Sequence, residues 1–131
     1  KWTQVTLQLQ TGHNHSCHHP RTHKINLKEI ERNPSALHNT QYKKIRRKEM
    51  LDGKRPAECD YCWNVEDNSD RFSDRVFKSG ETWSKPHFDE IKNSDWRANI
   101  NPRYVEVAFS NACNFFLEIV VSTFGHQRTS R

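Results

Sequence analysis

The sequence predicts an α+β fold, in which a small N-terminal segment is held together by a metal and is followed by a strand that opens a second unit. Two segments, 3–10 and 104–110, alternate apolar and polar side chains as half-buried strands do. Helical patterns and a dense group of cysteines and histidines lie between them. Hydrophobic residues make up 33% of the chain, against roughly 45–50% in ordinary domains. We therefore expect a thin core that a metal reinforces.

The first strand gives way to a segment of different composition. Segment 3–10, TQVTLQLQ, has a clean period of two. Segment 11–24, TGHNHSCHHPRTHK, contains Gly12 and Pro20, which predict a loop rather than a helix.

Two helices are predicted next. The first runs from Asn26 to Arg32 and ends at the Asn-Pro pair 33–34, and the second has Thr40 as its N-cap and ends at Gly53. Three apolar residues fall on one side of the second helix: Tyr42, Ile45 and Met50.

The remaining elements are sparse. Residues 68–80 are polar apart from Val76 and Phe77, and 85–92 predict another short helix. An Asn-Pro pair then precedes the strand at 104–110.

A C-x-x-C pair, Cys59 and Cys62, is the clearest chemical motif. Two residues between thiolates let both sulfurs face one metal from a tight turn, as in zinc and iron–sulfur sites. A thioredoxin-type redox pair is the alternative, but no apolar strand precedes this motif to give the strand-then-helix context. The pair therefore favours metal binding.

Cys17 lies in a second candidate group, surrounded by histidines. Neutral imidazole and thiolate both bind zinc and iron. A solvent-exposed polar loop is the alternative for any single histidine, but Cys17 with His18 or His19 is favoured as a ligand group. The histidines of the segment are His13, His15, His18, His19 and His23.

The formal net charge is +5, and the densest basic run is 43–48. Such a run can contact nucleic acid, but it is also typical of the solvated face of a helix. Acidic residues are spread through the rest of the chain, so nucleic acid is not the expected partner.

Two stretches resemble the radical S-adenosylmethionine (radical SAM) proteins, in particular those with twitch- or SPASM-like segments that occur in tailed phages and bacteria. In that family a first barrel strand leads into C-x-x-x-C-x-x-C, and YVEVAFSNACNF at 104–115 is similar to its start. Segment 39–75 is similar to another part of the family. In that part a helix is followed by C-x-x-C-aromatic, then Glu, then Ser-x-Arg. The matching positions are Asn39, Met50, Leu51, Gly53, Pro56, Cys59, Cys62, Trp63, Glu66, Ser73 and Arg75.

The sequence departs from the family after Cys113. The second and third cluster cysteines are expected at 117 and 120, where Leu117 and Val120 stand. Segment 117–131 does not continue the family pattern, so we expect a truncation or frameshift just after the first cluster cysteine.

The resemblance implies an enzyme with two metal centres in the intact parent. Cys113 would be the first ligand of a [4Fe–4S] cluster that binds S-adenosylmethionine, and Cys17, Cys59 and Cys62 would hold an auxiliary iron–sulfur cluster or zinc, with His18 or His19 as fourth ligand. The expected division is 1–100 for the auxiliary segment, 101–116 for the first strand of an incomplete (β/α) barrel, and 117–131 for an aberrant tail. The implied partners are a peptide or protein substrate and an electron donor such as flavodoxin or ferredoxin.

A second hypothesis is a small zinc-binding module that contacts nucleic acid through the basic helix. The chain alone is not expected to be an active enzyme under either hypothesis. No apolar run approaches the roughly 20 residues of a membrane span, and the expected location is the cytoplasm, which is that of the host if the chain is phage-encoded.

Overall fold

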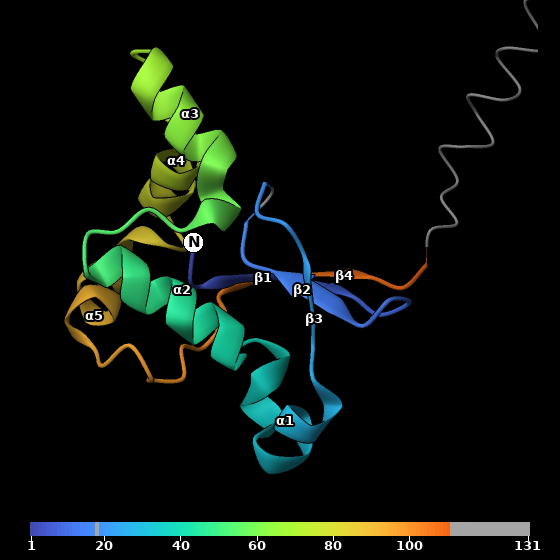
Figure 1. Cartoon of the computed structure of the whole chain (residues 1–131). Coiled ribbons are helices and arrows are strands. Elements are labelled where there is room, and N and C mark those ends of the chain that lie inside the picture. Colours follow the sequence, from blue (N-terminus) through green and yellow to red (C-terminus); the bar gives the residue numbers. More distant parts are fainter. Residues whose placement is uncertain (18, 111–131) are drawn as a thin grey trace, which may run out of the picture.

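The computed structural model describes residues 1–17 and 19–110, and in this part the chain is a mixed α+β protein with a small, open, four-stranded sheet (Figure 1). The α+β class is therefore confirmed. His18, Cys113, Leu117, Val120 and the segment 117–131 lie outside the described residues.

The sheet has the order β3-β2-β1-β4. Strand β1 (Gln4–Gln8) pairs antiparallel with β2 (His13–His15), which pairs antiparallel with β3 (His23–Lys24). On its other side β1 pairs parallel with β4 (Tyr104–Ala108), in the register Val5 opposite Val105. Both predicted strands are confirmed, and the two ends of the described chain meet in one sheet.

The prediction of a loop over 11–24 is wrong in part, because this segment contains β2 and β3. Gly12 has a φ of 68°, a conformation that glycine adopts without strain. Its N–H donates to the carbonyl of Gln8, which closes the turn between β1 and β2. The Gly12 turn therefore begins a hairpin. Backbone pairing forms strands here, although the polar composition predicted a loop.

The two predicted helices are confirmed with their caps. Helix α1 (Leu27–Arg32) begins at Asn26, whose side chain accepts a hydrogen bond from the N–H of Lys28. Helix α2 (Gln41–Leu51) begins at Thr40, whose hydroxyl accepts from the N–H of Lys43. A 3-10 turn, η1 (Pro34–Leu37), joins them.

The buried side of α2 carries two cations, Lys43 and Arg47, whereas Tyr42 and Ile45 remain more than one third exposed. Arg47 can be buried in place of an apolar residue because its guanidinium donates hydrogen bonds to the carbonyls of Trp96 and Ala98. These hydrogen bonds tie the irregular segment before β4 to the helix.

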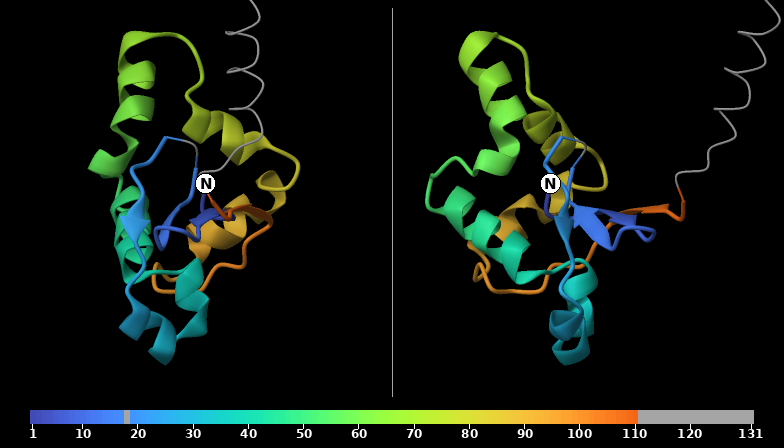
Figure 2. Two further views of the ribbon diagram at one scale, coloured as in Figure 1. Left: turned by 90° about the vertical axis from the view of Figure 1, so that its right-hand side faces the viewer. Right: turned by 45° about the vertical axis from the view of Figure 1, so that its right-hand side comes forward.

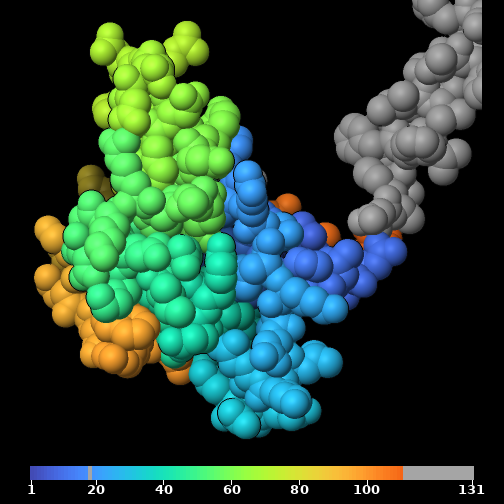
Figure 3. All heavy atoms as spheres, viewed as in Figure 1, coloured from blue at the N-terminus to red at the C-terminus, as the bar shows by residue number. Residues whose placement is uncertain are grey.

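The rest of the chain consists of short helices. The 3-10 turn η2 (Ala57–Cys59) leads into α3 (Asp60–Asn68), and α4 (Asp74–Gly80) follows in the segment predicted only as polar. The short helix predicted at 85–92 is confirmed as η3 (Lys85–His87) and α5 (Phe88–Asn93). Figures 2 and 3 show α3 at one end of the molecule and α1 at the other, and Figure 2 shows α4 near α3.

The buried interior of the described residues is unusually polar. The buried hydrophobic residues number seven, and three of them are the cysteines Cys17, Cys59 and Cys62. Fourteen polar or charged residues are buried as well. The expected thin core is present, so the burial of apolar side chains stabilises this fold only weakly.

Strand β4 forms one edge of the sheet, and all five of its residues are exposed. Val105 is 53% exposed and Val107 is 38% exposed. An exposed edge strand with apolar side chains presents backbone groups that can pair with another strand. Among the described residues, no helix is long and apolar enough to cross a membrane.

Candidate metal centre

The C-x-x-C motif lies where two helical segments meet. Cys59 is the last residue of η2, and Cys62 lies in the first turn of α3, with each side chain only 2% exposed. Trp63 fixes the entry to this turn, because its indole N–H donates to the carbonyl of Pro56 at 2.9 Å. The helix start therefore directs both thiols of the motif inward.

The thiol of Cys59 contacts a cation. The Nζ of Lys1 lies 2.8 Å from the Sγ of Cys59 and 2.5 Å from an Oε1 of Glu58. Burial raises the pKa of Cys59, and the charge and hydrogen bond of Lys1 oppose that rise. Lys1 therefore stabilises negative charge on this sulfur, which is the charge that a metal-binding cysteine carries.

The thiol of Cys62 faces a second set of donors. Burial raises the pKa of Cys62, while hydrogen bonds from the backbone N–H of Arg75 and from the side chain of Ser73 oppose the rise. Hydrogen-bond donors around a metal ligand orient it and stabilise its charged form. Both sulfurs of the motif thus have donors directed at them.

Cys17 comes from the other side of the site, just after β2, and is 1% exposed. Cys17 raises the pKa of Cys62 through its charge, and Cys62 does the same to Cys59, so the three sulfurs lie in one electrostatic neighbourhood. The three cysteines are free thiols. The carbonyl of Cys17 accepts a hydrogen bond from Nδ1 of His15.

The donor chemistry fits a thiolate metal centre, but the ligands are not preassembled. Among the described residues, no group of three or more histidine, cysteine, aspartate or glutamate side chains is arranged to hold a metal ion. The structure thus brings Cys17, Cys59 and Cys62 into one buried region without bringing their sulfurs into coordination geometry. Cys113, which the resemblance implies as a ligand of a second cluster, lies outside the described residues.

Of the two histidines proposed as the fourth ligand, the structure describes only His19. His18 lies outside the described residues. The ring of His19 stacks on Tyr61, with the ring centroids 3.9 Å apart, and its Nε2 forms a hydrogen bond with Asp74. His19 therefore lies at the helices that carry the site, but its ring is engaged there.

A carboxylate–guanidinium network holds α3 and α4 together behind Cys62. Arg75 donates from Nε and Nη2 to Glu66, and the hydroxyl of Ser73 donates to the same carboxylate. The guanidinium also lies 4.3 Å from the ring centroid of Trp63. Glu66, Ser73 and Arg75 are among the positions on which the resemblance was based, and in the structure their hydrogen bonds fix the loop that faces Cys62.

Lys1 and Glu58 are site residues that sequence reasoning missed. Their side chains are 4% and 6% exposed, so the ion pair is buried. The partners lie far apart in the chain and belong to no recognisable motif. Only the structure could bring them together.

The basic run on α2 does not form a free cationic face. Lys43 and Arg47 are buried, and Lys44 donates to the side chain of Asn99 at 2.7 Å. Two further cations pair along the helix, as Arg46 with Glu49 and Lys48 with Asp52. Among the described residues, Lys44 and Arg47 thus contact the segment before β4, whereas Arg46 and Lys48 pair within the helix region itself.

No protein-family model, curated protein or solved structure matches this chain.

Proposed function

We propose that this chain is the N-terminal segment of a radical SAM enzyme and that Cys17, Cys59 and Cys62 hold its auxiliary metal centre. The observation that carries the proposal is the convergence of three buried thiols, two of which receive hydrogen bonds from Lys1, Ser73 and Arg75. A thin polar core gives such a centre a structural role, because metal binding contributes directly to folding.

The ligands would close on the metal from two sides. Cys59 and Cys62 come from the start of α3, and Cys17 from the segment after β2. A histidine, His18 or His19, would supply the fourth ligand in a tetrahedral zinc site, and an iron–sulfur cluster would use the same thiolates. Metal binding would draw together three sulfurs that already influence one another's pKa.

The radical SAM part of the proposal rests on β4 and the sequence that follows it. A parallel strand with an exposed apolar edge and the sequence YVEVAFSNAC is what the first strand of a larger barrel requires. In the intact parent, a [4Fe–4S] cluster held by three cysteines would supply the electron that cleaves S-adenosylmethionine. Cys113 alone cannot hold such a cluster, so this chain by itself is proposed to be inactive.

Metal analysis after anaerobic purification tests the proposal. Wild type should retain one metal centre per chain, Cys59→Ala should lose it, and Cys113→Ala should keep it, because Cys113 belongs to the other cluster. Equal metal content in wild type and Cys59→Ala would refute the auxiliary centre.

Activity tests the second half of the proposal. The chain should form no 5′-deoxyadenosine when incubated anaerobically with iron, sulfide, dithionite and S-adenosylmethionine, whereas a parent protein with the complete barrel should form it. Turnover by the chain alone, above a protein-free control, would overturn its assignment as an inactive segment.

A further inference from the structure

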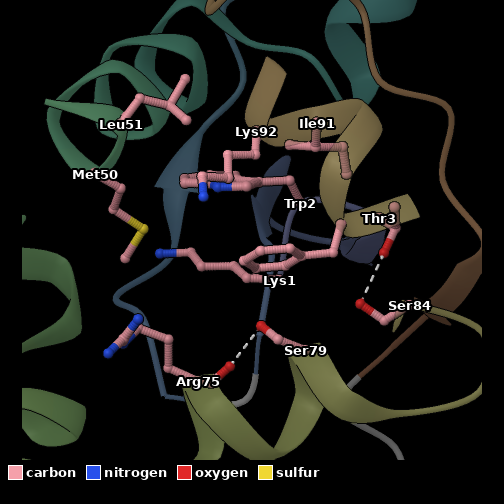
Figure 4. Close-up of a pocket in the computed structure, with 11 residues that line it drawn as sticks. Lys1, Trp2, Thr3, Met50, Leu51, Arg75, Ser79, Ser84, Ile91 and Lys92 are labelled. Atoms are coloured by element: carbon pink, nitrogen blue, oxygen red, sulfur yellow. Dashed lines mark hydrogen bonds between the residues drawn. The ribbon is translucent and has the colours of Figure 1, made fainter. Parts of the chain in front are cut away.

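A cavity of about 260 Å³ lies beside the cysteine region and shares Lys1 and Arg75 with it (Figure 4). Its walls come from the N-terminus, the end of α2, α4 and α5. Five of the side chains around it are apolar: Trp2, Met50, Leu51, Phe88 and Ile91. Leu51 is 39% exposed and Phe88 is 52% exposed, so large apolar side chains face open space here.

The charges around this cavity are all positive. Lys1, Arg75 and Lys92 line it, and among the described residues no aspartate or glutamate does. Lys1 is already paired with Glu58, and Arg75 with Glu66. Lys92 is exposed, and no ion pair is found for it in the described part of the chain. One cation is thus available to a ligand.

We propose that this cavity binds a small aromatic monocarboxylate. The aromatic ring would pack against Trp2, Met50 and Ile91, since indole faces and methionine sulfur both favour contact with aromatic rings. The carboxylate would pair with Lys92 at the rim. A single negative charge suits the site because the other two cations have partners within the chain.

The volume supports a small ligand. Pockets that enclose drug-sized molecules measure roughly 300–1,000 Å³, so a cavity of about 260 Å³ accommodates a single substituted ring. The two serines at the wall are engaged, because Ser79 donates to the carbonyl of Arg75 and Ser84 accepts from Thr3. Recognition therefore depends on shape and on Lys92. This inference stands apart from the metal proposal.

Met50 provides a direct probe, because it is the one methionine of the chain. Protein labelled with ¹³C-methyl methionine gives a single methyl signal at this cavity. Titration with phenylacetate should shift that signal to saturation. Phenylacetamide, which has the same ring and no charge, should bind about threefold to fivefold more weakly, as expected for the loss of one solvent-exposed ion pair.

Variants at two lysines separate local from general charge effects. Lys92→Gln should weaken phenylacetate binding to the level of phenylacetamide and leave phenylacetamide binding unchanged. Lys85→Gln, at an exposed lysine that does not line the cavity, should change neither.

Three results would overturn the proposal: a Met50 signal that does not saturate, equal affinity for the acid and the amide, or equal losses in the two lysine variants.

Discussion

Lys1 is the residue that links the sheet to the C-x-x-C motif. Its ammonium group binds Glu58 and Cys59 at the centre of the molecule, where the N-terminus lies in Figure 1. Burial acts to lower the pKa of Lys1, but Glu58 and Cys59 raise it overall, so the cation is retained. Removing one partner of a buried ion pair is costly because the other is left charged without a counter-ion.

Lys1→Met should therefore destabilise the fold by about 3 kcal/mol. The double variant Lys1→Met/Glu58→Gln should recover much of that loss, because no unpaired charge remains. Urea unfolding of both proteins, followed by tryptophan fluorescence, measures the difference. Equal destabilisation of the single and double variants would show that the ion pair is not the cause.

Lys43 is a buried cation of a different kind. It is 5% exposed, and its Nζ has no hydrogen-bond partner among the described residues. Burial lowers its pKa from 10.5 to about 7, although the charge of Glu58 acts to raise it. The unfolded chain therefore holds this proton more tightly than the folded protein does.

The sign of the pH effect follows from that difference. Between pH 7 and 10.5 the unfolded state binds more protons, so the contribution of Lys43 to stability improves as the pH rises through this window. Lys43→Met removes the buried charge, and its stability advantage over wild type should be largest at pH 7 and shrink toward pH 10. Unfolding in urea at several pH values tests this, and a constant advantage would contradict it.

At the scale of elements, α2 is organised by Arg47. Its guanidinium donates hydrogen bonds to the carbonyls of Trp96 and Ala98, which precede β4. Both carbonyls are partly buried, and truncation of the Arg47 side chain would leave them without this donor, which costs free energy.

Arg47→Met should cost about 2 to 4 kcal/mol of stability and loosen the segment before β4. Lys48→Met is the matched control on the same helix, since Lys48 is exposed and, among the described residues, pairs with Asp52 alone. Its effect should stay within about 0.5 kcal/mol. Thermal or urea unfolding compares the two. A loss in Lys48→Met as large as that in Arg47→Met would argue against the hydrogen bonds as the cause.

The elements predicted well are those with local signals. Asn26 and Thr40 cap helices that begin where they were expected, and the two alternating segments form β1 and β4. The hairpin at 13–24 was not predicted because its strands consist of polar residues and lack the apolar alternation of a strand. Backbone hydrogen bonds pair these strands. The buried cations of α2 were missed because their partners are carbonyls distant in sequence.

The cysteines of the candidate site could be picked out from the sequence, but their surroundings could not. Cys17, Cys59 and Cys62 lie in one buried region, and their role as metal ligands stays a prediction. The pairing of Lys1 with Glu58 depends on tertiary structure, which a single sequence does not encode in any local pattern.

At the scale of the whole molecule, the sheet joins the N-terminal strand to β4, and the cysteine region lies where the N-terminus meets α3 and α4 (Figure 1). The interior offers few apolar side chains, three of which are cysteines. A metal at these cysteines would therefore connect the sheet to the helices and replace part of the missing core.

X-ray absorption at the edge of the retained metal tests this account most directly. Wild type should show sulfur ligands at about 2.3 Å from the metal, and Cys17→Ala should show one sulfur fewer, because Cys17, Cys59 and Cys62 each supply a ligand. A metal with only nitrogen and oxygen neighbours, or an unchanged sulfur count in Cys17→Ala, would contradict the proposed centre.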